Sequence, residues 1–260
     1  MIAPTLRLCT WNLHLGLDLP GILKTLHSEP DFKGVEALAL QEASVHEGRE
    51  DAEVIAEHLG PSYRHRQVMT HTLKGHVQAN ALVWDTRRVE VTATSELVLP
   101  RRADNGLSRT ERTLLSVMRK QQRMSLAFDC RIGGLDWLLY VAHLDVFGYR
   151  HKLEQFGAIL ADCANRPPAD VTVIAGDLNT FRLVGRRPKW TRLAEKADAA
   201  GFEDLTGDIR WTHSFRRVPV RQKLDAIFIR SERSLLYQSW SLDLPGSDHI
   251  PVFADIKGWG

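Results

Sequence analysis

The sequence lacks the features of a secreted or membrane-spanning protein. Its three cysteines, Cys9, Cys130 and Cys163, are odd in number, far apart and without metal-ligand spacing. Each lies in an apolar stretch, so we expect buried free thiols of a reducing compartment. The first residues contain no apolar signal segment, and no run is long and apolar enough to cross a membrane. We therefore expect a cytoplasmic protein without a transmembrane segment.

The sequence also has no large excess of either charge, because it contains 34 basic and 32 acidic side chains and its net charge is +2. This balance does not by itself indicate a polyanion-binding protein. No low-complexity segment, linker or fixed-period repeat interrupts the 260 residues, of which 43% are hydrophobic. A chain of this length can bury a sizeable core. We expect one domain over residues 1–260, and a monomer.

Apolar runs of strand length occur along the whole chain and outnumber helical patterns. We predict strands at residues 6–11, 35–40, 63–69, 79–84, 89–97, 114–118, 124–132, 135–142, 171–175, 224–229, 235–242 and 252–256. We predict helices at residues 22–27, 50–59, 149–163 and 190–200, the third with Leu153, Phe156, Gly157, Leu160, Ala161 and Ala164 on one face. The Gly133-Gly134 pair indicates a hairpin. These elements favour an α/β fold of two packed sheets with helices outside.

The stretch from Val171 to Thr180 organises the chain. Its apolar, largely β-branched run predicts a buried strand. Gly176 is expected to end that strand and let the backbone turn. Asp177 and Asn179 are two residues apart, so in an extended chain their side chains would point the same way. A carboxylate and an amide at the mouth of a sheet could hold a hard cation, or orient a water against a phosphate.

Other predicted strands also end in polar residues, namely Asn12, Glu42, His143 and the pair Asp248-His249. Each alone has an ordinary interpretation as a turn, a cap or a satisfied histidine. Glu42 is more informative, because a carboxylate after a buried strand is desolvated unless a cation or a base pairs with it. Functional sites in layered α/β folds gather where strands end. The recurrence of polar strand ends therefore indicates one shared site.

The ordered motifs resemble those of the endonuclease/exonuclease/phosphatase superfamily, which includes DNase I-like nucleases, tyrosyl-DNA phosphodiesterases, neutral sphingomyelinases and inositol polyphosphate 5-phosphatases. The motifs are Thr10-Trp11-Asn12, Leu40-Gln41-Glu42, His143-Leu144, Gly176-Asp177-Leu178-Asn179, Leu224-Asp225 and Ser247-Asp248-His249. The resemblance covers nearly the whole chain but does not separate the branches of the superfamily. It implies a four-layer αββα sandwich, two packed mixed β-sheets flanked by helices, that hydrolyses a phosphate ester.

The resemblance also implies a divalent cation, Mg²⁺ or Mn²⁺. Glu42 would be its main ligand, with Asn12 and Asp248 in support. Oxygen ligands suit these ions, and no cysteine–histidine cluster in the sequence calls for zinc.

Catalytic roles are implied for five further residues. Asp177 would orient or deprotonate the attacking water, and Asn179 would hold that water or a phosphate oxygen. His249 would hydrogen-bond the scissile phosphate, and Asp225 would fix the His249 ring. His143 matches a position that is histidine in many nucleases of the superfamily and often tyrosine in its abasic endonucleases. A cation and an imidazolium would stabilise the charge that builds up on the phosphate.

Two more residues have weaker signals. Asn80 resembles a position that contacts phosphate in the superfamily. Asp145 follows His143 by two residues, and we expect an exposed structural residue there.

The substrate is indicated only by the basic residues around the motifs. They form three runs: Arg101, Arg102, Arg109, Arg112, Arg119, Lys120 and Arg123; Arg182, Arg186, Arg187, Lys189 and Arg192; and Arg216, Arg217, Arg221 and Lys223. Such runs could follow a nucleic-acid backbone or form solvated basic faces. Trp190 and Trp211 could stack on bases, although core packing is expected for each.

We therefore expect a metal-dependent phosphodiesterase, an endonuclease or exonuclease acting on DNA or RNA, with repair of a protein–DNA end as one variant. The alternative is a phosphoesterase for a small or lipid-derived phosphate, like a sphingomyelinase or an inositol phosphatase. A binding module without catalytic activity is a third hypothesis, which intact motif residues disfavour.

Overall fold

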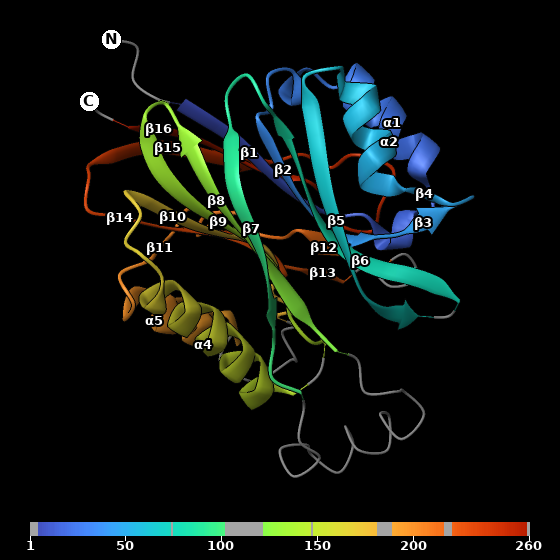
Figure 1. Ribbon diagram of the computed structural model, residues 1–260. Helices are drawn as coiled ribbons and strands as arrows, with labels where there is room; N and C mark the ends of the chain where they lie inside the picture. The colour runs from blue at the N-terminus through green and yellow to red at the C-terminus, as the bar shows by residue number, and fades with distance from the viewer. Residues whose placement is uncertain are drawn as a thin grey trace.

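Two six-stranded β-sheets pack face to face, and helices cover the outer face of each sheet (Figure 1). The computed structural model describes residues 5–73, 75–101, 122–146, 148–180, 189–215 and 220–258. Each sheet contains both parallel and antiparallel pairs. The predicted four-layer sandwich of two mixed sheets flanked by helices is therefore confirmed. The extent of the domain, residues 1–260, remains a proposal.

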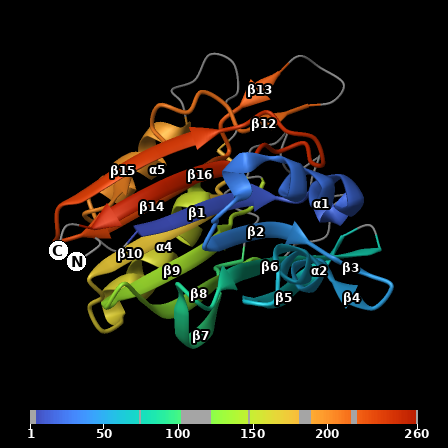
Figure 2. The same ribbon diagram turned by 90° about the horizontal axis from the view of Figure 1, so that it is seen from above.

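The first sheet contains both ends of the described chain. Its strands, in spatial order, are β15 (Leu235–Ser241), β16 (Val252–Gly258), β1 (Thr5–Asn12), β2 (Ala37–Ala43), β6 (His76–Asp85) and β5 (Tyr63–Leu73). Only β1 and β2 run parallel. The short elements on this side are η1 (His14–Gly16), α1 (Leu19–Ser28), η2 (Pro30–Phe32), β3 (Val45–His46), β4 (Arg49–Glu50) and α2 (Asp51–Leu59). Helices α1 and α2 pack on the outer face (Figure 2).

The second sheet supplies most of the predicted catalytic residues. Its strands, in spatial order, are β11 (Glu203–Asp204), β14 (Asp225–Ser231), β10 (Val171–Asp177), β9 (Leu135–His143), β8 (Met124–Ile132) and β7 (Glu90–Val98). Only β9 and β10 run parallel. The helices of this side are α4 (Tyr149–Asn165) and α5 (Lys189–Asp198), and a small hairpin pairs β12 (His213–Ser214) with β13 (Arg221–Gln222).

The alternation of side chains along each strand explains the layers. On β1, Leu6 and Leu8 enter the core between the sheets, whereas Cys9 and Trp11 enter the core beneath α1 and α2. Strand β10 is buried at every position, because the other sheet covers one face and α4 and α5 cover the other. The predicted buried central strand is therefore confirmed.

Gly176 does not end its strand. The strand β10 continues through Asp177, and Gly176 keeps a φ of +149° within it. A Cβ atom there would lie 1.8 Å from the carbonyl oxygen of Ala142 on β9. Glycine is needed because two backbones approach closely, rather than because the chain turns.

The buried face of α4 also differs from the predicted one. Phe156 belongs to both, but the helix buries the polar residues His151, Lys152 and Gln155. Leu153 and Leu160 are only partly buried, on the flank of the core. An apolar pattern cannot reveal a face on which polar side chains are buried for hydrogen bonding.

Several smaller predictions are tested by the described residues. The three cysteines are free and buried, as expected. The Gly133-Gly134 hairpin is confirmed by the pairing of Ile132 with Leu135. The predicted strand at residues 114–118 lies outside the described residues. Within the described part, none of the helices combines the length and the apolar character needed to span a membrane.

Candidate active site

Strand ends from both sheets meet at one place. Within the second sheet, Asp177 at the end of β10 pairs with His143 on β9 and with Asp225 on β14. In the first sheet, Asn12 ends β1. Its Nδ2 donates a hydrogen bond to Asp177 Oδ2 at 3.0 Å, so the amide joins the two sheets. Residues that are far apart in the sequence therefore form a single cluster.

The Asp177 carboxylate is the centre of this cluster and is 1% exposed. Besides Asn12, two imidazoles approach its Oδ2 atom: His143 Nε2 at 3.6 Å and His249 Nε2 at 3.8 Å. Its Oδ1 atom accepts a hydrogen bond from the backbone N–H of Asn179 at 2.8 Å. The carboxylate is thus fixed on both oxygens, with its imidazole neighbours on one side.

Burial makes Asp177 a stronger base than an ordinary aspartate. Desolvation raises the pKa of its carboxyl to about 7, and the nearby charges of Asp225 and Glu42 act in the same direction. The charge of His249 and the N–H of Asn179 oppose this shift. A carboxylate with a pKa near neutrality can accept a proton from water at neutral pH.

His249 is held between carboxylates. Its Nδ1 lies 2.8 Å from Asp225 Oδ2, and its carbonyl oxygen accepts a hydrogen bond from the Trp11 indole at 3.0 Å. Burial alone would lower the pKa of His249, but Asp225 and then Asp177 raise it to about 10. At neutral pH the ring is therefore an imidazolium, a donor next to Asp177.

His143 is the opposite case. It is buried, and Nη1 of Arg123 lies 3.0 Å from its Nδ1. Burial and the Arg123 charge lower the pKa of His143 well below 6.5, so the ring is neutral. Arg123 also approaches Asp145, at 3.4 Å, and both residues are buried. The predictions of an exposed Asp145 and of Arg123 in a surface basic run are therefore wrong.

Glu42 lies beside His143 at the end of the first sheet. Its backbone adopts a φ of +50°, where the pairing of β2 with β6 shifts register. The nearest atom pair joins His143 Nε2 and Glu42 Oε1 at 3.8 Å. Among the described residues, no other cationic or histidine side chain lies within 4 Å of this carboxylate. The side chain is 20% exposed, so it can still reach a solvent-borne cation.

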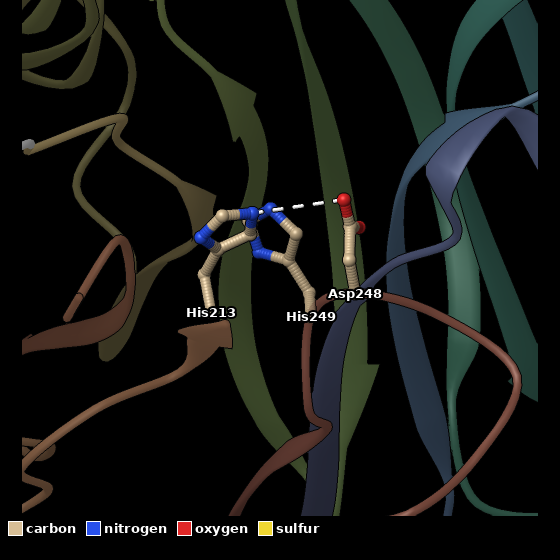
Figure 3. A group of neighbouring side chains, drawn as sticks. All are labelled: His213, Asp248 and His249. Carbon is tan, nitrogen blue, oxygen red and sulfur yellow. Dashed lines mark ion pairs between the residues drawn. The ribbon is translucent and has the colours of Figure 1, made fainter. Parts of the chain in front are cut away.

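Asp248 is held by two histidines that sequence reasoning missed. Its Oδ2 lies 2.5 Å from His14 Nδ1. The same oxygen lies 3.6 Å from His213 Nε2 (Figure 3). Burial would raise the pKa of Asp248, but these histidines and His249 lower it far below its ordinary value. His14 follows Asn12 by two residues and could have been noticed, whereas no local pattern indicates His213.

Asn179 is buried in the site but does not point as predicted. Its φ is +50°, so the chain is not extended there. Its Nδ2 donates to the carbonyl oxygen of Leu144 at 2.9 Å. The expectation that Asp177 and Asn179 share one direction along an extended strand is therefore wrong. Lys152, a buried lysine of α4, donates to the carbonyl oxygen of Asn179 and was also missed.

Asn80 is buried on β6, and its Nδ2 donates to the carbonyl oxygen of Met124 at 2.7 Å. A contact of Asn80 with phosphate remains a prediction.

Solved structures with this architecture are similar to nearly the whole chain. An endonuclease/exonuclease/phosphatase family protein from Bacteroides thetaiotaomicron is 14% identical, with 99% of each chain covered and a TM-score of 0.71. TDP2 of D. rerio, complexed with a single-strand DNA product, is 18% identical over 97% of this chain and 98% of its own, with a TM-score of 0.70. A mannosyl-6-phosphatase from B. thetaiotaomicron is 14% identical over 96% and 99%, with a TM-score of 0.69.

The chain has the fold of the endonuclease/exonuclease/phosphatase superfamily. No family model and no curated protein matches its sequence. The superfamily fold that the ordered motifs implied is therefore present, at a sequence identity too low to carry more than the fold.

The resemblance to this superfamily implies a divalent cation, and the side chains near Asp177 are suitable ligands for one. The described residues contain two groups whose potential ligand atoms lie within 4.8 Å of one another: Asp177, Asp225 and His249, and His213, Asp248 and His249. Glu42 adds a carboxylate, and the neutral His143 lies 3.8 Å from it. Burial raises the pKa of Asp177, the charges of Asp225 and Glu42 raise it further, and a cation would offset this concentration of negative charge.

The basic runs are only partly described. Arg182, Arg186, Arg187, Arg216, Arg217 and the middle of the first run lie outside the described residues, as does the Trp190 side chain. Lys223 is partly buried and pairs with Asp204 at 3.4 Å. Arg221 is exposed, and its guanidinium lies 4.0 Å from the ring of Trp211, which is half-buried. Trp211 therefore packs against an arginine at the surface, and the expectation of core packing is wrong.

Proposed function

We propose that this chain is a divalent-metal-dependent phosphodiesterase that acts on nucleic acid. One observation carries the proposal: the buried Asp177 carboxylate lies within 4 Å of two imidazoles, one neutral and one held as a cation by Asp225. A buried base beside a proton donor is the arrangement that hydrolysis of a phosphate diester needs.

In this proposal Asp177 takes the proton of the attacking water. Asn12 and the backbone N–H of Asn179 fix the orientation of the carboxylate. The water oxygen forms a bond to phosphorus while the bond to the leaving oxygen breaks, and the proton lost by the water passes to Asp177. The pKa of about 7 makes Asp177 an effective acceptor near neutral pH.

His249 acts on the phosphate itself. Its Nε2–H donates a hydrogen bond to a phosphate oxygen and passes that proton to the leaving oxygen as the bond from phosphorus to that oxygen breaks, which leaves the ring neutral. Asp225 keeps the ring charged and oriented through the 2.8 Å contact at Nδ1. His143, which stays neutral, can donate its one N–H to a phosphate oxygen without adding charge.

Glu42 would hold the cation, with Asn12 and Asp248 in support. Mg²⁺ or Mn²⁺ bound there would neutralise the charge that develops on the phosphate oxygens. The Oδ1 of Asn12 accepts the His14 N–H at 2.9 Å and has a second lone pair for a cation.

Nucleic acid is the substrate that the surface near His249 supports. The hairpin of β12 and β13 presents Phe215, which is 38% exposed, and the Arg221–Trp211 stack. Aromatic rings and arginines of this kind stack on bases and contact phosphates. The similar TDP2 structure contains a single-strand DNA product. We also propose that the protein is cytoplasmic, because free, buried cysteines suit a reducing compartment. We propose a monomer as its oligomeric state.

The alternative is a phosphoesterase for a small or lipid-derived phosphate, and one similar structure is a sugar-phosphate phosphatase. The test compares hydrolysis of plasmid DNA and of bis-p-nitrophenyl phosphate, with Mg²⁺ and with EDTA, by the wild type and by His249→Ala. We expect plasmid cleavage that requires both the metal and His249. Cleavage of the small diester alone would favour the alternative, and no turnover of either would oppose both.

A further inference from the structure

A short backbone bridge places two histidines side by side next to the proposed catalytic centre. Residues His213 and His249 pair in an antiparallel bridge. The N–H groups of Ser214 and Ile250 donate across it, at 3.0 and 2.7 Å, on either side of the pair. This is the non-hydrogen-bonded type of pair, in which opposite side chains approach most closely. The two rings accordingly lie 4.6 Å apart between centroids, inclined by 60°.

Asp248 adds a carboxylate to the two imidazoles (Figure 3). His213 Nε2 and Asp248 Oδ2 are 3.6 Å apart, and the ligand atoms of all three residues lie within 4.8 Å of one another. An ion with bonds of about 2.0–2.2 Å to nitrogen and oxygen keeps its neighbouring ligand atoms about 3.0–3.6 Å apart. The three side chains are therefore close to the spacing that one ion requires.

The surroundings of the trio support ion binding. Asp225 contacts Nδ1 of His249 at 2.8 Å, the carboxylate–histidine contact that commonly orients a metal ligand. His14 contacts Asp248 Oδ2 at 2.5 Å. The His14 backbone lies in the left-handed region, with a φ of +50°, a conformation that is unfavourable for a non-glycine residue. Strain of this kind is found where a side chain must reach a particular position.

We propose that His213, Asp248 and His249 form a transition-metal site that prefers Zn²⁺-type ions and that shares only Asp248 with the oxygen-ligand site at Glu42. Two nitrogens and one carboxylate oxygen suit Zn²⁺ better than Mg²⁺, which prefers oxygen ligands and water. Three protein ligands leave a position open for water or a phosphate oxygen. His213 lies in a different segment of the chain from the adjacent pair Asp248 and His249, so sequence spacing could not reveal this group.

The site has a consequence that rests on the proposed function. Zn²⁺ would bind the Nε2 lone pair of His249, the atom that carries the donated proton in the proposed reaction. Zn²⁺ would therefore inhibit Mg²⁺-dependent hydrolysis by occupying His249. Binding of the ion itself does not depend on that function.

The test is calorimetric titration of the metal-free full chain with Zn²⁺, for the wild type, His213→Phe and His58→Phe. Phenylalanine preserves the ring that packs edge-on against Phe215 at 4.5 Å and removes the ligand nitrogen. His58 is the control, because its ring neighbours that of His27, with centroids 6.1 Å apart, in another pair of histidines. Urea unfolding of each variant checks that the fold is retained.

We expect one tight Zn²⁺ site in the wild type and in His58→Phe. Loss of an outer partner of a metal ligand commonly weakens binding 10–100-fold, so His213→Phe should weaken it by about 100-fold or more. An affinity unchanged in folded His213→Phe would overturn the proposal, as would a wild type without tight binding. Inhibition by Zn²⁺ is then measured on the diester substrate: a chain that binds Zn²⁺ but hydrolyses no diester would refute the proposed function and leave the metal site standing.

Discussion

Replacing Asp225 by Asn should change the titration of His249 more than any other single substitution. In the wild type, Asp225 contributes the largest effect that raises the pKa of His249, with Asp177 next. Asparagine keeps a hydrogen-bonding group 2.8 Å from Nδ1 but removes the negative charge. Burial lowers the pKa of His249, and in the variant only the remaining carboxylates oppose this effect. The His249 ring of the variant should therefore lose its proton near neutral pH.

The magnitude follows from the structure. The pKa of His249 is about 10 against an ordinary value of 6.5, a difference worth about 5 kcal/mol of favourable interaction with the imidazolium. Because the folded-state pKa is raised, this stabilisation is fully present below pH 6.5 and is lost as the pH rises toward 10. Most of that stabilisation should be missing in Asp225→Asn. The unfolding free energies of the two proteins should therefore differ most at low pH and converge at high pH.

Nuclear magnetic resonance of the histidine rings in the metal-free protein measures this effect directly. His249 of the wild type should stay protonated to above about pH 9, whereas in Asp225→Asn it should titrate near neutrality. Turnover with Mg²⁺ should fall by about 100-fold or more, with an alkaline limb that begins at lower pH. Glu50→Gln is the control, because Glu50 lies 3.3 Å from the partly exposed His65. An ion pair in contact with water contributes little to stability. A wild-type His249 that titrates near its ordinary pKa would refute the reasoning.

Three further substitutions test other parts of the site. Glu42→Ala should abolish Mg²⁺-dependent turnover and weaken Mg²⁺ binding in calorimetry, and near-normal turnover would contradict its role as main ligand. Asp177→Asn should retain Mg²⁺ binding but lower kcat by about 100-fold or more, because the amide cannot accept the proton of water; unchanged kcat would remove that role. Gly176→Ala should lower the unfolding free energy in urea by about 3 kcal/mol, because its Cβ meets the Ala142 carbonyl oxygen at 1.8 Å. Gly34→Ala, with φ +78° and open space, should cost only about 1 kcal/mol, and equal losses would refute the steric argument.

The architecture could be predicted because local signals and tertiary packing agree along most of the chain. Strand β10 is apolar throughout since both of its faces are covered, and the sequence shows this as an uninterrupted run. The hairpin at Gly133 and Gly134 is equally local, because both residues need positive φ. Polar residues at several strand ends indicate the site from the sequence alone. The structure brings Asn12, His143 and His249 within 4 Å of Asp177.

The parts that could not be predicted depend on contacts between distant segments. The role of Gly176 depends on the backbone of β9, and the buried face of α4 depends on the loop that Lys152 contacts. Positive φ at Glu42 and Asn179 redirects both side chains; glutamate gives no signal of that conformation, and asparagine adopts it more often than most residues but does not require it. His213 reaches the site only through its bridge to the segment of His249.

The ligand atoms in the site explain why Mg²⁺ would bind at Glu42, whereas Zn²⁺ would bind at His213 and His249, with Asp248 belonging to both sites. Three carboxylates, those of Asp177, Asp225 and Glu42, lie close together; burial raises the pKa of Asp177 most, and the charges of Asp225 and Glu42 raise it further. The described histidines add one positive charge, on His249, because His143 is neutral. The ligand atoms beside Asp177 and Glu42 are carboxylate and amide oxygens, which Mg²⁺ prefers. Asp248 instead contacts imidazole nitrogens, so the ion attracted there is selected by nitrogen ligands rather than by excess charge.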